Sequence, residues 1–150
     1  MSVASFLKAE HSTAFSFEVL PPLRGNSIDT LFSSVERLMQ FSPAYINITT
    51  HRTEVVYKEV SAGVFQRTTE RKRPGTVAIA AALKSRYGVA AVPHVICSGF
   101  TPSELENELI DLSYLGITDL LVLRGDKAKH ESVFTPEPNG PSHAIELEEQ

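Results

Sequence analysis

One sequence feature restricts the possible folds of this chain more than any other. Apolar runs alternate with helical segments, and each run leads to a polar side chain. The runs are FSFE, which ends at Glu18; YINIT, which ends at Thr49; VPHVIC, which contains His94; and LLVLRG, which Asp126 follows. This alternation predicts parallel strands, and in parallel α/β proteins the carboxyl ends of the strands build the active site. The sequence therefore predicts the catalytic face of an enzyme.

Side-chain periodicity gives the expected elements. In the first strand Phe15, Phe17 and Val19 share one face, whereas Ser16 and Glu18 share the other. The fourth strand is nearly all apolar, as a strand covered on both faces is. We expect strands over residues 14–19, 45–49, 90–97 and 119–123, and helices over 26–40, 76–87, 102–115 and from 143 onward.

The helix after the third strand has the clearest local signature. Thr101 is its expected cap, Pro102 takes the first helical position, and Glu104 completes a capping box. Gly116 ends the helix. Leucines at helical spacing form the expected buried stripe: Leu105, Leu109, Leu112 and Leu115.

The pattern breaks after the second strand. Two segments, EVVYKEV and VFQRTT, are joined by Ser61-Ala62-Gly63, and this arrangement is typical of a β-hairpin. We therefore expect a hairpin insertion over residues 51–74, in which the charged run 70–73 is a solvated connector rather than a binding patch.

The length of 150 residues suits one domain. A complete (β/α)8 TIM barrel needs roughly 250 residues, and four parallel strands are half of such a barrel. We therefore predict an α/β fold in which residues 1–150 form a single partial (β/α)8 TIM barrel. The chain is expected to be a fragment, or to be truncated relative to its relatives.

Composition and short motifs exclude several classes of protein. A net charge of −4 gives no reason to expect nucleic acid or an acidic membrane as partner, and Cys97 alone forms no intrachain disulfide. The sequence has no export signal and no stretch of about 18 apolar residues, so we expect a cytoplasmic protein. The histidines lack metal-ligand spacing, and no G-x-G-x-x-G or Walker loop occurs.

Each polar residue at a strand end has two interpretations. Glu18 is either a solvated carboxylate or, between aromatic residues and a double proline, a partly desolvated general acid. His94 by itself suits a hydrogen-bonded core position as well as a site. Asp126 suits a simple turn cap after Gly125.

Taken together, the sequence resembles the methylenetetrahydrofolate reductase family. The similarity covers most of the chain from Phe15 onward, but only about the amino-terminal half of the family's catalytic barrel. Three features together are specific for this family. They are FSFE followed by two prolines, a strand that contains proline and histidine, and the closing LRGD. The matching segments are FSFEVLPP (15–22), INITT (46–50), VPHVIC (92–97), TPSELENELIDLSYLGI (101–117) and LVLRGD (121–126).

The resemblance implies a barrel that binds FAD at the carboxyl ends of its strands. It also implies reduction of 5,10-methylenetetrahydrofolate to 5-methyltetrahydrofolate with NADH or NADPH, in one-carbon metabolism and methionine biosynthesis. The substrate is then a folate, and no metal is required.

Residue by residue, Glu18 matches the general acid that opens the five-membered ring of the folate to an iminium ion. Asp126 matches a carboxylate beside the flavin, where its charge restrains the reduction potential and favours a cationic intermediate. His143 and Ala144 fall where the family has a tyrosine and an alanine lining the flavin. The remaining positions expected to bind the cofactor are Thr49, Thr50, His94, Arg124, Gly125 and Asp126 itself.

The chain departs from the family after Thr49. A tyrosine and a glycine-rich loop are usual there, whereas this chain has Thr50, His51 and Arg52 before the hairpin. Two alternatives stay open: a different TIM-barrel enzyme, because fold does not fix function, and a non-catalytic half-barrel module. A half-barrel leaves the edges of its outer strands unpaired, which favours the non-catalytic module for the isolated chain. Because exposed strand edges tend to pair with other strands, we also expect a homo-oligomer.

Overall fold

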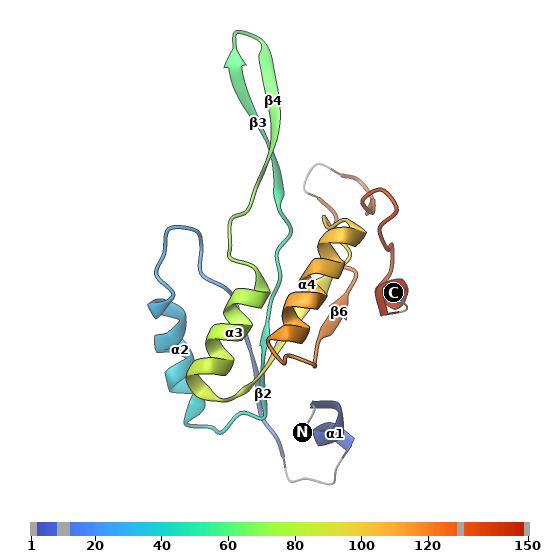
Figure 1. Cartoon of the computed structure of the whole chain (residues 1–150). Helices are drawn as coiled ribbons and strands as arrows, with labels where there is room; N and C mark the ends of the chain where they lie inside the picture. Colours follow the sequence, from blue (N-terminus) through green and yellow to red (C-terminus); the bar gives the residue numbers. More distant parts are fainter. Residues whose placement is uncertain (1–2, 9–12, 129–130, 149–150) are drawn as a thin grey trace.

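A parallel sheet of four strands forms the body of the chain in the computed structural model, which describes residues 3–8, 13–128 and 131–148 (Figure 1). The strands are β1 (Ser16–Val19), β2 (Tyr45–Ile48), β5 (Ala90–Ile96) and β6 (Leu121–Leu123). They lie in the order β1-β2-β5-β6, and every neighbouring pair is parallel. The predicted α/β fold, a partial TIM barrel, is therefore confirmed.

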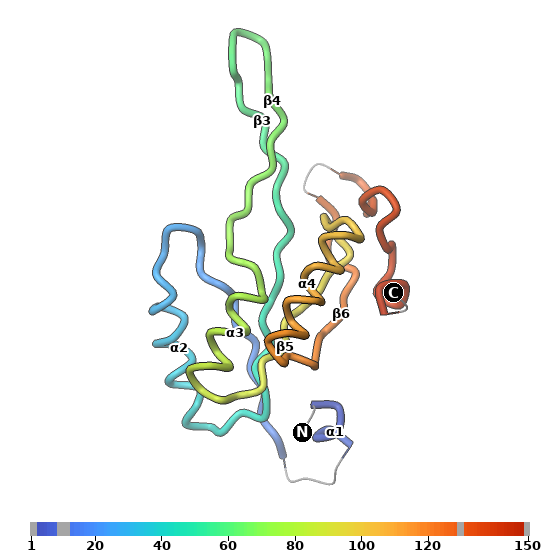
Figure 2. Tube along the Cα trace, in the orientation of Figure 1, coloured from blue at the N-terminus to red at the C-terminus, as the bar shows by residue number. Residues whose placement is uncertain are grey.

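Three helices connect these strands and lie on the same face of the sheet (Figure 2). They are α2 (Asp29–Met39), α3 (Thr76–Tyr87) and α4 (Pro102–Tyr114). Parallel neighbours need such crossover connections, because a tight hairpin reverses the strand direction. The short helix α1 (Val3–Lys8) lies at the amino ends of the strands, and α5 (Ala144–Glu148) packs beside β6.

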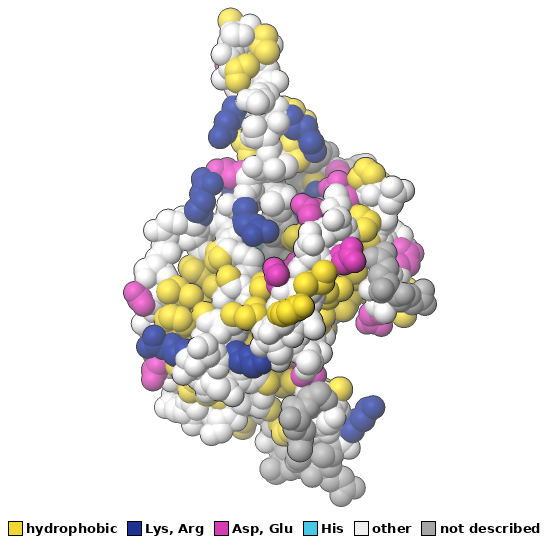
Figure 3. All heavy atoms as spheres, viewed as in Figure 1, with side chains coloured by type: hydrophobic (Ala, Val, Ile, Leu, Met, Phe, Trp, Pro, Cys, Tyr) yellow, Lys and Arg dark blue, Asp and Glu magenta, His cyan; other side chains and the backbone are white. Residues whose placement is uncertain are grey.

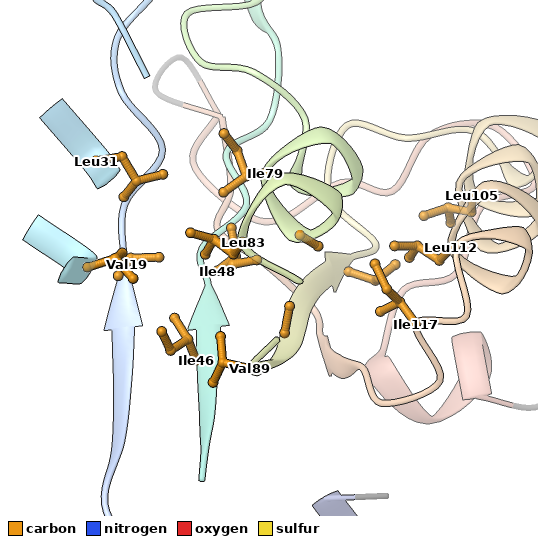
Figure 4. Packing of buried hydrophobic residues seen from close by; sticks show 14 of the residues in the cluster. Val19, Leu31, Ile46, Ile48, Ile79, Leu83, Val89, Leu105, Leu112 and Ile117 are labelled. Carbon is orange, nitrogen blue, oxygen red and sulfur yellow. The ribbon is translucent and has the colours of Figure 1, made fainter. Parts of the chain in front are cut away.

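The hydrophobic core lies between the sheet and these helices (Figure 4). Ile46 and Ile48 of β2 are fully buried there, together with Leu83 of α3. Because side chains alternate along a strand, Tyr45 and Asn47 point to the opposite face, which would line the inside of a barrel. Complete burial of one such aliphatic side chain contributes about 1.5–3 kcal/mol.

The predicted capping box of α4 is present. The amide of Glu104 donates to Thr101 Oγ1 at 3.3 Å, and the amide of Thr101 donates to Glu104 Oε2 at 2.8 Å. The predicted apolar stripe is only half right, because Leu109 is half-buried and Leu115 is 42% exposed. Leu109 is rotated by about 40° from the buried Leu105, and Leu115 lies past the last turn.

The inner face of the sheet is exposed at its edge strands β1 and β6 in the described residues, whereas Val92, His94 and Ile96 of β5 are buried. The exposure of β6 overturns the expectation for the fourth strand. Leu121 and Leu123 are each 38% exposed, so β6 is covered on one face only. The strand also begins later than expected, because its pairing with β5 starts only at Leu121, opposite His94. The carboxylate of Asp119 accepts a hydrogen bond from the amide of Val3 at 2.9 Å. Within the described sheet, β1 and β6 each have one unpaired edge.

The predicted hairpin is also confirmed. Strands β3 (Glu54–Ser61) and β4 (Val64–Glu70) are antiparallel and project away from the sheet at the end where β2 stops (Figure 1). Four of its apolar side chains are more than half exposed: Tyr57, Val60, Val64 and Phe65. Lysine and arginine side chains gather around the base of the hairpin (Figure 3).

Candidate active site

The carboxyl ends of β2, β5 and β6 border a cavity of about 720 Å³. Most of its lining follows directly after a strand, as the sequence predicts for a barrel site. Six of the lining residues were expected to bind the cofactor: Thr49, Thr50, His94, Arg124, Gly125 and Asp126. The remaining lining residues are His51, Arg52, Ile96, Ser98 and Leu123.

Glu18 lies next to this cavity, beside His94. The register pairs Glu18 with Asn47 and Asn47 with Val92, so these side chains point to the same inner face. His94 is two residues after Val92 and shares that face. As a result, Glu18 Oε2 lies 3.7 Å from Nε2 of His94. The expected acid and an expected cofactor-binding residue are therefore neighbours in space.

The His94 side chain is only 6% exposed. Burial lowers the pKa of His94 below its ordinary value, and the negative charge of Glu18 opposes this shift only in part. The imidazole is therefore neutral at pH 7. Among the described residues its Nε2 atom has no hydrogen-bond partner. His94 is thus a buried histidine that also forms part of the cavity wall.

The side chain of Glu18 is 58% exposed, so of its two interpretations the described structure agrees with the solvated carboxylate. Phe17 and Val19 flank it in sequence but point to the helix-covered face, where they cannot shield it. At β1 the inner face has no cover in the described residues. Glu18 is therefore accessible to water and to a substrate that approaches from that side.

A glycine with a left-handed backbone sets the shape of the Arg124–Asp126 turn. The amide of Ser98 donates to the carbonyl oxygen of Arg124 at 3.1 Å, so the pairing of β5 with β6 extends to this point. Gly125 then adopts a φ of +80°, and a Cβ atom there would lie 2.8 Å from the Cβ of Ser98. The turn can approach Ser98 this closely only because residue 125 is glycine.

The two threonines after β2 are held by their neighbours. The amide of Thr49 donates to the carbonyl oxygen of Val19 at 3.1 Å, which extends the pairing of β1 with β2. Thr50 Oγ1 lies 3.5 Å from Oγ1 of the buried Thr76. The hydroxyl of Thr76 in turn donates to Glu108 Oε1 at 2.9 Å. Burial raises the pKa of Glu108. The hydroxyl of Thr49 also donates to the carbonyl oxygen of Val19, at 3.4 Å, so the side chains of Thr49 and Thr50 each have a hydrogen-bond partner at the cavity.

His143 and Ala144 do not line this cavity. They lie at the start of α5, which is anchored in the core by Leu147. The His143 side chain is 68% exposed, and its Nδ1 lies 3.3 Å from Oε1 of Glu146. The structure therefore places these two residues outside the cluster, and their contact with a flavin stays a prediction.

Sequence reasoning did not single out Ser98 and Arg52. Ser98 is fully buried directly after β5, so the rule that identified the other strand-end residues also applies to it. Arg52 lies in an irregular segment between β2 and β3, and no periodicity or motif marks it. Its place at the cavity depends on the path that the chain takes into the hairpin.

Two further observations concern the described residues as a whole. None of their helices combines the length and the apolar character needed to cross a membrane. No three or more of their His, Cys, Asp and Glu side chains are grouped so that they could hold a metal ion.

The fold and the site together define a partial α/β TIM barrel with a polar cluster at the carboxyl ends of its strands. Comparison with known proteins then identifies the kind of barrel. The chain belongs to the methylenetetrahydrofolate reductase family, because the model of that family, described as Methylenetetrahydrofolate reductase, matches residues 3–149.

Individual relatives agree with this assignment. The chain is 33% identical over 111 residues to 5,10-methylenetetrahydrofolate reductase of Escherichia coli (strain K12), a match that covers 74% of this chain and 32% of that protein. It is 26% identical over 135 residues to Methylenetetrahydrofolate reductase (NADH) 1 of Arabidopsis thaliana, covering 90% of this chain and 20% of that protein. The chain thus spans a third or less of the length of these relatives.

Proposed function

We propose that this chain forms the amino-terminal half of the catalytic barrel of a flavoprotein oxidoreductase. That enzyme reduces 5,10-methylenetetrahydrofolate to 5-methyltetrahydrofolate, with FAD as its cofactor and NADH or NADPH as electron donor. Family membership supports the reaction, since relatives that carry this name match the chain. The cofactor, the electron donor and the roles of the residues are our inference.

One observation carries the proposal. Residues that are far apart in the sequence, and that were expected to bind the cofactor, line a single cavity, and the expected acid lies at its edge. Glu18 Oε2 lies 3.7 Å from Nε2 of His94, so the expected acid is next to the residues that line the cavity. A chance resemblance in short motifs gives no reason for this convergence.

The cavity fits a flavin dinucleotide in size and charge. Its volume of about 720 Å³ falls within the range of ordinary ligand sites, roughly 300–1,000 Å³. The lining contains the guanidinium groups of Arg52 and Arg124, which are permanently cationic, as well as the carboxylate of Asp126. FAD has two negatively charged phosphates and a flat polar ring system, both of which suit such a lining.

Bound FAD would supply the hydride transfer that connects the nicotinamide to the folate. The residues of this chain supply the proton and the charge. The exposed Glu18 donates a proton to the folate nitrogen when the five-membered ring opens, and water can restore that proton afterwards. The carboxylate of Asp126 stabilises positive charge that develops on the substrate.

The test uses the full-length gene product that carries this chain. We expect a yellow protein whose flavin spectrum bleaches with NADH or NADPH in the absence of oxygen. Addition of 5,10-methylenetetrahydrofolate then restores the oxidised spectrum and yields 5-methyltetrahydrofolate. A purified protein that neither binds FAD nor forms this product would overturn the proposal.

A further inference from the structure

Arg52 occupies an unusual place at the mouth of the site. It lies between the end of β2 and the start of β3, and its side chain is only 18% exposed. It lines the cavity described above and two adjoining cavities, of about 510 and 400 Å³. A guanidinium is always charged, and its burial is costly unless it has partners.

The first partner of Arg52 leads to Asp126. Arg52 Nη1 donates to the hydroxyl of Ser98 at 3.0 Å, and that hydroxyl lies 2.6 Å from the backbone carbonyl oxygen of Asp126. A guanidinium can only donate hydrogen bonds, so the serine oxygen accepts from Arg52, and the serine hydroxyl donates to the backbone carbonyl oxygen of Asp126. The buried hydroxyl of Ser98 thus accepts one hydrogen bond and donates another, and these two partners fix its orientation.

The second partner of Arg52 lies further along the same loop. Arg52 Nη1 is 3.8 Å from Oε2 of Glu131, which also accepts a hydrogen bond from the amide of Ala128 at 2.8 Å. Lys127 Nζ donates to the backbone oxygen of Glu131 at 2.7 Å. The guanidinium therefore contacts the chain after β6 in two ways, through Ser98 at Asp126 and directly at Glu131.

Close packing at Gly99 keeps Arg52 in this position. Gly99 has a φ of +74°, and a Cβ atom there would lie 3.1 Å from the Cβ of Arg52 and 3.2 Å from its Nε. The arginine stem therefore rests directly on the turn that follows Ser98. Its path leaves little room for another conformation.

We propose that Arg52 is a positioning residue, which fixes the turn that presents Asp126 to the reaction site. The role of Asp126 in this inference rests on the proposed function, whereas the link between Arg52 and the turn does not. Arg52 acts through Ser98 and Glu131. Because β3 begins two residues later, the arginine also connects the base of the hairpin to the site.

The first experiment measures amide hydrogen exchange in the full-length protein without added flavin. We expect Arg52→Met to speed exchange in peptides covering 121–128 by roughly tenfold, which is the loss of about 1.4 kcal/mol of local stability. Arg52→Lys keeps the charge but not the forked donors, so it should give an intermediate rate. The matched control is Arg37→Met, on the exposed side of α2 and remote from the site.

Unchanged exchange in Arg52→Met would overturn the proposal, and so would an equal effect of the control. If Arg52→Met does not fold, Ser98→Ala decides, because it removes only the connection to Asp126. The same protection in Ser98→Ala as in the unmodified protein would also refute the idea. None of these outcomes depends on whether the protein binds FAD.

The second experiment uses the flavin-loaded enzyme and asks whether the turn matters for chemistry. Ser98→Ala changes no charge, so an altered flavin potential in this variant reports a displaced Asp126. We expect its potential to shift in the same direction as that of Asp126→Asn. An unchanged potential in Ser98→Ala would show that the connection does not position the carboxylate.

Discussion

Replacement of Gly125 by alanine tests whether the Arg124–Asp126 turn is as tightly packed as the structure indicates. The φ of +80° is unfavourable for any residue with a Cβ, at a cost of about 1–2 kcal/mol. The new Cβ would also lie 2.8 Å from Cβ of Ser98 and 3.2 Å from Cβ of Ile96. Both neighbours are buried, and overpacking of this kind costs roughly 1–3 kcal/mol.

The two contributions together predict that Gly125→Ala lowers the free energy of unfolding by about 2–5 kcal/mol. Ser98 cannot move away freely, because its hydroxyl is held between Arg52 and the carbonyl oxygen of Asp126. Gly88→Ala is the matched control. Gly88 has a φ of +64° at the end of α3, but a Cβ there meets no atom within 4 Å.

Urea unfolding followed by circular dichroism gives the free energy for both variants at one protein concentration. The unfolded-state effect of adding a methyl group is similar in the two, so it cancels in the difference. We expect Gly125→Ala to be less stable than Gly88→Ala by about 1–3 kcal/mol, and only Gly125→Ala to weaken flavin binding. If the two variants lose the same amount of stability, the turn accommodates the new methyl group at no cost. The inference that Gly125 is closely packed against Ser98 and Ile96 would then be wrong.

Four further predictions concern chemistry, pH and assembly. In the complete enzyme, Glu18→Gln is expected nearly to abolish folate reduction while the nicotinamide still reduces the flavin, because the amide cannot donate the proton; near-normal turnover would refute the assignment. Asp126→Asn should raise the flavin potential and slow the folate half-reaction, and an unchanged potential in a redox titration would leave Asp126 as a turn cap. Because burial lowers the folded-state pKa of His94, the unfolded state binds a proton first, so stability should fall as the pH drops below about 6.5 toward that lower value. His94→Gln should flatten this part of the urea-derived pH profile, and an identical slope in both proteins would contradict the cause given. The 150-residue chain alone should self-associate and bind FAD weakly, and sedimentation that shows a monomer with stoichiometric FAD would contradict this.

Most of the fold could be predicted because local and long-range signals agree in this sequence. The hairpin expected at 54–60 and 64–69 is found at Glu54–Ser61 and Val64–Glu70. Thr101 marks the start of α4 correctly, since a capping box is a local interaction. The helix α1 gives no such signal, and one of its contacts, with Asp119, spans 116 positions in the sequence.

The site was predictable where strand geometry alone decides a position. The alternation of side chains along the first strand predicted that Glu18 lies on the inner face. The match to the family singled out His94 near the end of the third strand. Their 3.7 Å contact depends on the register between three strands, which no local pattern contains. Arg52 was missed for a related reason, since the irregular segment after β2 carries it to Ser98, which is 46 positions away.

The place of their strands in the sheet explains why Glu18 and His94, although neighbours, differ so much in burial. His94 lies in β5, which has a strand on each side, whereas Glu18 lies in β1, whose outer edge is free in the described sheet. Their side chains are 6% and 58% exposed. A strand added beyond β1 would pair this free edge. The four strands of this chain therefore place Glu18 beside His94, and the free edge of β1 leaves only Glu18 of the two exposed to water.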